Sequence, residues 1–221
     1  MANETILSKK QQELLDLIGR DKNLCQSFYL TGGTALAEFY LHHRYSEDLD
    51  FFSEHEFEPQ SVSVFWQKIK KTVGIKKVDF EQSFNRNLFF LHLGKEVIKT
   101  EFTYFPFPRI EAKKKIGGLA IDSLLDIAVN KIFTIYQKPR ARDFIDLYFI
   151  IQKNKKLTIA DLVKKAKVKF DWHIDPLQLG AQFMQATVLK DYPRMIVKTD
   201  DEKWQNFFVG EAEKLKKEIL S

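Results

Sequence analysis

The sequence has very little cysteine: Cys25 is the only one among 221 residues. One thiol cannot form an intramolecular disulfide, so the chain is not a disulfide-stabilised secreted scaffold and suits a reducing cytosol. Long apolar runs are also lacking, because stretches such as FIDLYFII are too short to span a bilayer and carry a charge. The polar start MANETILSKKQQELLDLIG does not resemble a signal peptide. We therefore expect a cytoplasmic protein with no membrane partner.

The five histidines lack the spacing of a zinc site, since His42 and His43 are adjacent and point in different directions on a helix. Internal repeats and low-complexity linkers are also lacking. What remains is a globular chain, 44% hydrophobic, with enough residues for one large domain or two small ones. The net charge of +5 fits a phosphate-rich partner such as RNA or nucleotides. A lysine-rich solvated surface is the alternative explanation.

The hydrophobic pattern changes character near residue 119. Short β-prone runs come before it, at 28–30, 48–53, 76–82, 87–93 and 97–105. Helical patterns lie between them, at 8–18, 34–43 and 60–72. Residues 106–118, with two prolines and a Gly-Gly pair, indicate a crossover or hinge. From residue 122 onward the spacing is helical, so we expect an α+β fold: a mixed-sheet α/β domain at 1–118 and a helical domain at 119–221.

The most informative stretch is YLTGGTALAEFYLHHRYSEDLDFFS, residues 29–53. Side chains alternate along a strand, so Asp48 and Asp50 share one face, and their like charges need a neutralising partner such as a divalent metal. Upstream, Gly32 and Gly33 let the backbone approach an anion at a helix start, and the Thr34 hydroxyl can donate to a phosphate. The structural alternatives are a simple turn and a carboxylate pair that caps a loop.

Two further carboxylates lie in β-prone runs and could complete a metal site with Asp48 and Asp50. Glu101 is the best candidate, because it is an acidic residue in the apolar, β-prone run IKTEFTYF and shares a face with Lys99 and Thr103. Asp79, in KKVDFEQ, is the second candidate. A solvated strand face is the structural alternative for both.

A second group of charges lies in the helical half. Lys131 is the basic residue of an otherwise apolar helix, and a buried ammonium needs a partner such as a triphosphate. Asp143 and Asp146 are three residues apart, so they share one face of the next helix. Pairing of these aspartates with Lys131 or Arg142, which would lock the two helices together, is the structural alternative.

A Gly-Gly turn followed by a strand with Asp-x-Asp resembles the DNA polymerase beta-like nucleotidyltransferase superfamily. The segments TGGTALAEFYLHHRYSEDLDFF and ARDFIDLYFI are similar to the AbiEii/AbiGii toxin family of bacterial abortive-infection and toxin–antitoxin systems. The resemblance covers roughly residues 25–150. It implies a nucleotidyltransferase fold with a small mixed sheet, a helical domain that completes the nucleotide cleft, and transfer of a nucleoside monophosphate from an NTP.

The resemblance also implies roles for single residues. Mg²⁺ or Mn²⁺ would be bound by Asp48, Asp50 and Glu101, which form the catalytic set. The NTP would be bound by Gly32, Gly33, Thr34, Arg44, Lys131, Asp143 and Asp146. For Arg44, in a pattern R-x-S/T-x-D-L-D, phosphate contact, support of Asp48 and a surface salt bridge are all open.

By resemblance the acceptor is RNA, with the tRNA 3′ end as a reasonable candidate, and a cognate antitoxin is an expected partner. Two other functions remain open. One is a non-catalytic nucleotide-binding or interaction protein, and the other is a small-molecule nucleotidyltransferase of the aminoglycoside-modifying type. The sequence does not determine which NTP is used, because base selection depends on pocket shape.

Overall fold

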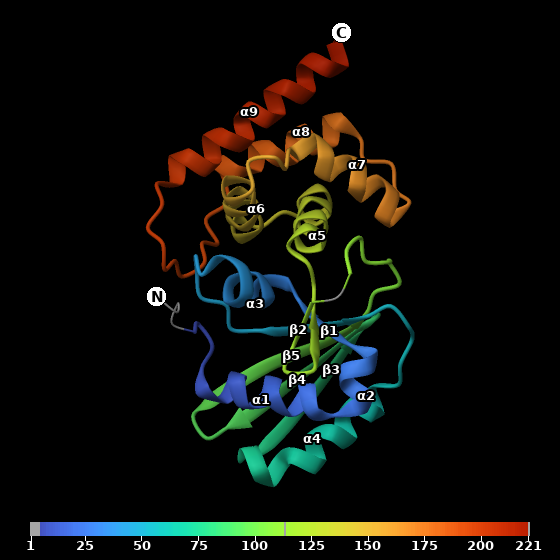
Figure 1. Ribbon diagram of the computed structural model, residues 1–221. Coiled ribbons are helices and arrows are strands. Elements are labelled where there is room, and N and C mark those ends of the chain that lie inside the picture. Colours follow the sequence, from blue (N-terminus) through green and yellow to red (C-terminus); the bar gives the residue numbers. More distant parts are fainter. Residues whose placement is uncertain (1–4, 113, 221) are drawn as a thin grey trace. The chain divides into compact units, whose positions relative to one another are not determined.

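The structure is a computed structural model that describes residues 5–112 and 114–220, and the chain divides into two compact units (Figure 1). Unit 1 combines the chain up to Tyr40 with Ser46–Ser123, and unit 2 combines Leu41–Tyr45 with Leu124 onward. The sequence pattern placed the boundary after residue 118. The units change over later, at residue 123, and a five-residue segment of the N-terminal half lies in unit 2.

Unit 1 contains a seven-stranded mixed sheet, counted over the described residues, in the order β3-β4-β5-β2-β1-β7-β6. The strands are β1 (Tyr29–Thr31), β2 (Leu49–Ser53), β3 (Lys77–Ser83), β4 (Arg86–Leu93), β5 (Glu96–Tyr104), β6 (Lys114–Ile116) and β7 (Leu119–Ile121). Strand β2 runs parallel to β5, and β1 runs parallel to β7. The other neighbouring pairs are antiparallel. The mixed sheet predicted from the sequence is confirmed.

Among the helices of unit 1, the first two begin at residues whose side chains cap them. They are α1 (Lys9–Arg20), α2 (Lys22–Ser27), α3 (Gly32–Leu36) continued by the π-helical η1 (Ala37–Leu41), and α4 (Pro59–Val73). Ser8 caps α1 in a reciprocal capping box with Gln11, and Pro59 is the first residue of α4. Helix α2 was not predicted, although Asp21 caps it by accepting from the backbone of Asn23 and Leu24.

An aromatic core packs α4 against one face of the sheet. The Phe102 ring of β5 stacks on Phe51 of β2 with 4.8 Å between ring centroids, and Trp66 of α4 lies 6.1 Å from Phe102. All three side chains are fully buried. Because strand side chains alternate, the residues next to Phe51 and Phe102 point to the opposite face, and these are Asp50 and Glu101. Burial of the aromatic face therefore fixes the orientation of the carboxylates.

Unit 2 is helical, as predicted. Its elements are α5 (Leu124–Gln137), α6 (Ala141–Lys153), α7 (Ile159–Phe170), α8 (Pro176–Met184), the 3₁₀ turn η2 (Gln185–Thr187) and α9 (Asp201–Leu220). Phe208 of α9 contacts Phe144 of α6 and Phe183 of α8, with centroid distances of 4.8 and 5.4 Å. The α6 start is capped from a distance, because the Asp191 carboxylate accepts from the Ala141 backbone N–H at 2.9 Å.

The segment expected to be a crossover or hinge, residues 106–118, contributes β6 to the sheet, and β7 follows it directly. Strand β7 is fully buried and lies parallel to β1, with Tyr29 opposite Ala120. A three-residue strand that is buried on both faces shows no alternation, and its pairing with β1 is distant in sequence. Its pairing with β6 is local, because Gly117 and Gly118 form a two-residue hairpin turn between the two strands. Lys113, inside this segment, lies outside the described residues.

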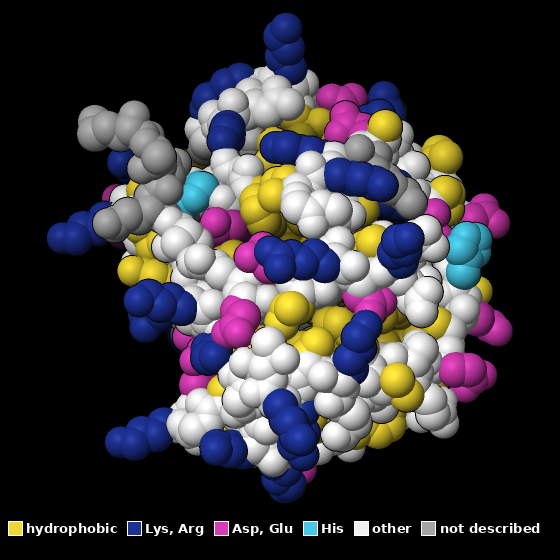
Figure 2. All heavy atoms as spheres, turned by 60° about the horizontal axis from the view of Figure 1, so that its bottom comes forward, with side chains coloured by type: hydrophobic (Ala, Val, Ile, Leu, Met, Phe, Trp, Pro, Cys, Tyr) yellow, Lys and Arg dark blue, Asp and Glu magenta, His cyan; other side chains and the backbone are white. Residues whose placement is uncertain are grey.

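The surface carries charges of both signs. On the face shown in Figure 2, lysine and arginine side chains are scattered among acidic and apolar ones and do not gather in one patch. None of the described helices is both long and apolar enough to cross a bilayer.

Replacement of Phe102 tests the aromatic core of unit 1. Phe102→Ala should lower the free energy of unfolding by about 3–5 kcal/mol, because a fully buried ring is lost and a cavity is left. Phe84→Ala is the matched control, since that ring is 97% exposed, and should change stability by less than about 0.5 kcal/mol. Urea unfolding followed by circular dichroism measures both. Equal losses in the two variants would contradict this assignment of the core.

Candidate active site

Gly32 of the Gly-Gly turn lies in direct contact with Asp50, the second aspartate of Asp-x-Asp. Strands β1 and β2 pair with Thr31 opposite Asp50, and Gly32 follows Thr31 at the start of α3. Gly32 has φ +72°, and a Cβ built on it would lie 2.5 Å from Asp50 Oδ2. Both the left-handed backbone and the close carboxylate thus require glycine. The turn and the Asp-x-Asp strand, predicted as two parts of one motif, are adjacent in unit 1.

Asp48 immediately precedes β2 and is fixed from two sides. The Thr34 hydroxyl of α3 donates to the Asp48 backbone carbonyl, and Lys99 Nζ of β5 lies 2.7 Å from Asp48 Oδ2. Thr34 is fully buried. Its hydroxyl proton therefore holds α3 to the start of β2, a different use from the phosphate contact expected from the sequence.

Glu101, the preferred third carboxylate, lies beside Asp50. The parallel pairing of β2 and β5 places these two residues opposite each other, so both project from the same face. Asp79, the second candidate, is on β3, and strands β4 and β5 separate β3 from β2. Asp79 pairs there with Lys77 and His92. Of the two candidates, the fold brings only Glu101 next to the Asp-x-Asp strand.

Glu101 is held by a guanidinium that sequence reasoning did not single out. Arg86 Nε and one terminal nitrogen each lie 2.6 Å from a Glu101 oxygen, and the Thr103 hydroxyl donates to the same carboxylate at 2.9 Å. Burial by itself would raise the pKa of Glu101, but the Arg86 pair outweighs it and lowers that pKa. The pKa of Arg86 is raised by the Glu101 pair, with smaller contributions from Asp50 and Asp48.

The donor chemistry of this face fits a hard divalent cation, because Asp48, Asp50 and Glu101 supply carboxylate oxygens from adjacent strands. As the side chains stand, the described residues contain no group of three or more acidic, histidine or cysteine side chains arranged around one metal position. The Glu101 carboxylate is directed to Arg86 instead. Mg²⁺ or Mn²⁺ would be held here by these three residues after a change in their side-chain partners.

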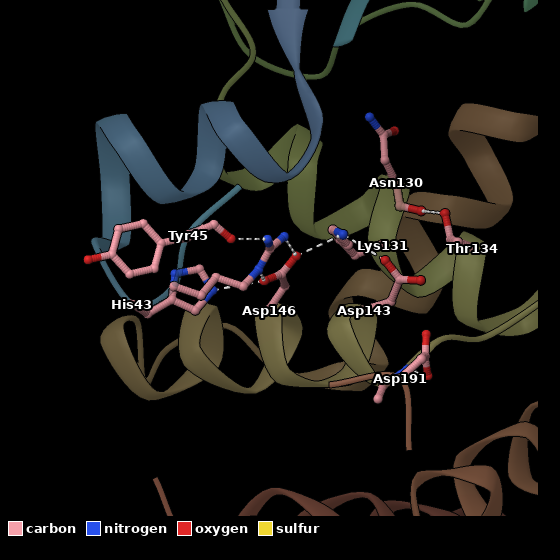
Figure 3. A network of polar contacts seen from close by, with 10 residues as sticks. His43, Tyr45, Asn130, Lys131, Thr134, Asp143, Asp146 and Asp191 are labelled. Carbon is pink, nitrogen blue, oxygen red and sulfur yellow. Dashed lines mark hydrogen bonds and ion pairs between the residues drawn. The ribbon is translucent and has the colours of Figure 1, made fainter. Parts of the chain in front are cut away.

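The second predicted group of charges forms a buried network in unit 2 (Figure 3). Lys131 Nζ of α5 lies 2.6 Å from Asp143 Oδ1 and 2.8 Å from Asp146 Oδ2, both on α6. The Lys131 side chain is 12% exposed and that of Asp146 is fully buried. This is the arrangement given above as the structural alternative, since it locks α5 to α6.

The segment Leu41–Tyr45 supplies the rest of the network. Arg44 Nε and one terminal nitrogen lie 2.6 and 2.8 Å from the two Asp146 oxygens, and His43 Nε2 lies 2.8 Å from Asp146 Oδ1. Arg44 is buried, so its ion pair with Asp146 is not at the surface. His43 was considered only as a metal ligand in the sequence. The run of basic residues His42, His43 and Arg44 shortly before β2 was the sequence signal available for this network.

The network keeps its charges at neutral pH. Burial opposes ionisation of Asp146, but Lys131, Arg44 and His43 hold the pKa of that carboxyl well below its ordinary value. Burial likewise opposes the charge of Lys131, and the two aspartates outweigh it and raise the Lys131 pKa. Asp146 is therefore the central anion on which three cationic or polar side chains converge.

Similar chains are known. A protein of Aquifex aeolicus (strain VF5) described as uncharacterized is 34% identical over 168 residues, which cover 74% of this chain and 76% of that protein. A crystal structure of a proposed nucleotidyltransferase from H. pylori superposes with a TM-score of 0.62 at 19% identity, covering 96% of this chain and 97% of that one. The crystal structure of JHP933 from Helicobacter pylori gives 0.59 at 20% identity, covering 96% and 94%.

The structural likeness identifies the fold as that of nucleotidyltransferases, which confirms the predicted fold class. The family described as "Nucleotidyl transferase AbiEii toxin, Type IV TA system" matches residues 16–215. The chain belongs to this AbiEii family, as the sequence resemblance indicated. Family and fold together support an enzyme of nucleotidyl transfer.

The contact between Gly32 and Asp50 can be tested by stability. Gly32→Ala should destabilise the protein by more than about 2 kcal/mol, because it combines left-handed strain with a collision against Asp50 Oδ2. Gly74→Ala is the matched control, at φ +81° with nothing within 4 Å, and should cost only the strain of about 1–2 kcal/mol. Thermal unfolding compares them. A Gly32→Ala loss no larger than that of Gly74→Ala would refute the close approach.

Asp146 should make stability depend on acid pH. A carboxyl with a depressed pKa stabilises the fold above its unfolded pKa, about 3.9, and that contribution is lost as pH falls through the lower folded pKa. At pH 7, Asp146→Asn should lower the free energy of unfolding by about 3–5 kcal/mol, since buried cations lose their partner.

The difference between wild type and Asp146→Asn should shrink below about pH 4, where the wild-type carboxyl begins to lose this contribution. Urea unfolding at several pH values measures it. Glu213→Gln, an exposed carboxylate on α9, is the control and should behave as wild type at each pH. A difference between Asp146→Asn and wild type that stays constant down to pH 2 would contradict the ionised network.

Proposed function

We propose that this protein transfers a nucleoside monophosphate from an NTP to a hydroxyl of an RNA acceptor, and that it acts as the toxin of a toxin–antitoxin or abortive-infection system. One observation carries the proposal. The Gly32 turn contacts Asp50, and Asp50 lies opposite Glu101 on the adjacent strand. A turn that can approach a phosphate would then lie against paired carboxylates that can hold a metal, which supports phosphoryl transfer at this position.

The transfer step is an in-line displacement at the α-phosphorus. The acceptor hydroxyl oxygen forms a new bond to that phosphorus, the bond to the bridging oxygen of the β-phosphate breaks, and pyrophosphate leaves. Asp48, Asp50 and Glu101 would hold Mg²⁺ or Mn²⁺, which when bound supplies positive charge to the phosphate oxygens. The acceptor's proton passes to Glu101. Because Arg86 lowers the Glu101 pKa, this carboxylate is a weak base as long as that pair persists.

The remaining predicted residues would bind the nucleotide. Gly32, Gly33 and Thr34 are the first residues of α3, where backbone N–H groups lack partners within the helix and can donate to the β- and γ-phosphates. Lys131 uses two of its three ammonium donors for Asp143 and Asp146, so a third can meet a phosphate. Asp143 and Asp146 hold Lys131 charged and in place for that contact.

RNA is favoured over a small-molecule acceptor by the net charge of +5, which suits a polyanion. The tRNA 3′ end, which presents a free hydroxyl, is our proposed site of transfer. The family's description as a toxin of a type IV system supports a cognate antitoxin as partner. An acceptor of RNA type predicts salt-sensitive association, because phosphate contacts release counterions.

The first experiment is a labelling assay. Purified protein is incubated with Mg²⁺, total bacterial RNA and each α-³²P-labelled NTP in turn. We expect label in RNA with wild type and a loss on the order of 100-fold or more with Asp50→Ala, because a carboxylate of the transfer site is removed. Asp79→Asn, a carboxylate on β3 outside the site, is the matched control and should keep wild-type transfer.

The assay separates the remaining functions. Label in an added aminoglycoside, with none in RNA, would replace the RNA acceptor by a small molecule. Absence of label in RNA, aminoglycoside and the protein itself would contradict catalysis. Equal transfer by Asp50→Ala and wild type would refute the carboxylate site.

A further inference from the structure

Two cations occupy the carboxylates of the candidate site. Arg86 meets both oxygens of Glu101 at 2.6 Å, and Lys99 meets Asp48 Oδ2 at 2.7 Å. We name this pair of cations, with the two carboxylates they contact, the cation latch. All four residues belong to unit 1: Arg86 lies on β4, Lys99 and Glu101 lie on β5, and Asp48 immediately precedes β2. These three strands are neighbours in the sheet (Figure 1).

The register of the strands brings the four residues of the latch together. The pairing that sets Asp50 opposite Glu101 also sets Leu49 opposite Thr100, so one residue earlier Asp48 is level with Lys99. Asp-x-Asp on one strand is thereby matched by Lys-x-Glu on the next. On the other side, Leu88 is opposite Glu101, which makes Arg86 its diagonal neighbour and within reach of a long side chain.

The latch and a divalent cation draw on the same oxygens. A guanidinium in bidentate contact uses both Glu101 oxygens, and the Thr103 hydroxyl takes a further acceptor position on Oε1. A divalent cation bound to these oxygens would lie within a few ångströms of two like charges, in a partly desolvated site where repulsion is strong. Metal binding at the three carboxylates and an intact latch therefore oppose each other.

The two ends of the latch differ in freedom. The Glu101 side chain is 7% exposed, whereas that of Arg86 is 48% exposed. Arg86 can thus swing into solvent, or toward a polyphosphate, without disrupting the core, while Glu101 stays in place. Lys99 is 27% exposed and has a flexible stem. At the Glu101 end the cation is thus the exposed partner, whereas at the other end Asp48, at 37%, is more exposed than Lys99.

We propose that Arg86 and Lys99 are positioning residues that stand in for the divalent cation and compete with it, so that metal binding requires them to leave Glu101 and Asp48. This inference rests on the proposed function of the same carboxylates. In the metal-free protein the latch offsets the repulsion among Asp48, Asp50 and Glu101. Release of the latch frees the Glu101 carboxylate and gives two cations that can meet the phosphates of the incoming nucleotide.

The test is Mn²⁺ binding to the intact protein without nucleotide, with free Mn²⁺ measured by electron paramagnetic resonance. Arg86→Gln should tighten Mn²⁺ binding by about tenfold, because a like charge next to a ligand is removed while a hydrogen-bond donor remains. Lys99→Gln should also increase the affinity for Mn²⁺, so the proposal stays testable if one variant fails to fold. Arg86→Lys keeps the charge and should bind Mn²⁺ as weakly as wild type.

Two controls complete the set. Lys77→Gln removes an exposed positive charge from β3, where Lys77 pairs with Asp79, and should change the affinity by less than about twofold. Asp50→Asn removes a ligand and should weaken Mn²⁺ binding by more than about tenfold. A thermal-shift series gives a second readout, in which Mn²⁺ raises the melting temperature of Arg86→Gln more than that of wild type.

The outcomes separate the latch from the site itself. Tighter binding by Arg86→Gln or Lys99→Gln, with Arg86→Lys and Lys77→Gln unchanged, supports the latch. Unchanged or weaker binding by both glutamine variants, together with loss in Asp50→Asn, overturns the latch and leaves the carboxylate site standing. Mn²⁺ binding that Asp50→Asn does not weaken overturns the metal site, and with it both the latch and the metal-dependent step of the proposed function.

Discussion

Repulsion among carboxylates on one face of a sheet is the constraint on which the rest of unit 1 depends. Asp50 and Glu101 face the same way because Phe51 and Phe102, their chain neighbours, are buried with Trp66 on the opposite face. The aromatic core thus forces like charges together. Arg86 pairs with Glu101 and Lys99 pairs with Asp48, and both contacts offset this repulsion. Gly32 leaves room for the Asp50 carboxylate beside the turn.

Unit 2 also contains a carboxylate that needs neutralising, but here the carboxylate is fully buried. Asp146 is fully buried, and its charge is tolerated because Lys131, Arg44 and His43 converge on it. Breaking such a network leaves an uncompensated buried charge, so its members depend on one another. The network joins α5 and α6 to the segment Leu41–Tyr45, which comes from the other half of the sequence. This polar cluster adds to the apolar side chains that α5 and α6 also bury.

The sequence was most informative where chemistry is encoded in local spacing. Asp-x-Asp predicts two carboxylates on one face of a strand. A Gly-Gly pair before a helix predicts a turn whose backbone can lie close to another group, and Ser8 before an amphipathic run predicts a capped helix. Each of these follows from neighbours within a few residues, and the structure contains each of them. The family resemblance rests on the same local patterns, which is why it agrees with the match over residues 16–215.

Local patterns did not determine partners that meet through the fold. The register of β4 with β5 makes Arg86 the diagonal neighbour of Glu101, and no spacing along the chain records this. Strand β7 was not predicted as a strand, because the Gly-Gly pair that joins it to β6 was interpreted as a hinge and its pairing with β1 is distant in sequence. Thr34 has the residue type of a phosphate donor, yet its hydroxyl is used by the Asp48 carbonyl.

The sequence by itself determined the family, the α+β class of the fold and the carboxylates proposed for the candidate site. Periodicity and short motifs are read within a single strand or helix, so they are independent of how strands are ordered. Only the tertiary structure decided which cation meets which carboxylate, because strand order and register bring together residues far apart in the chain. For a site built from like charges, those partners decide how readily the carboxylates can accept a metal.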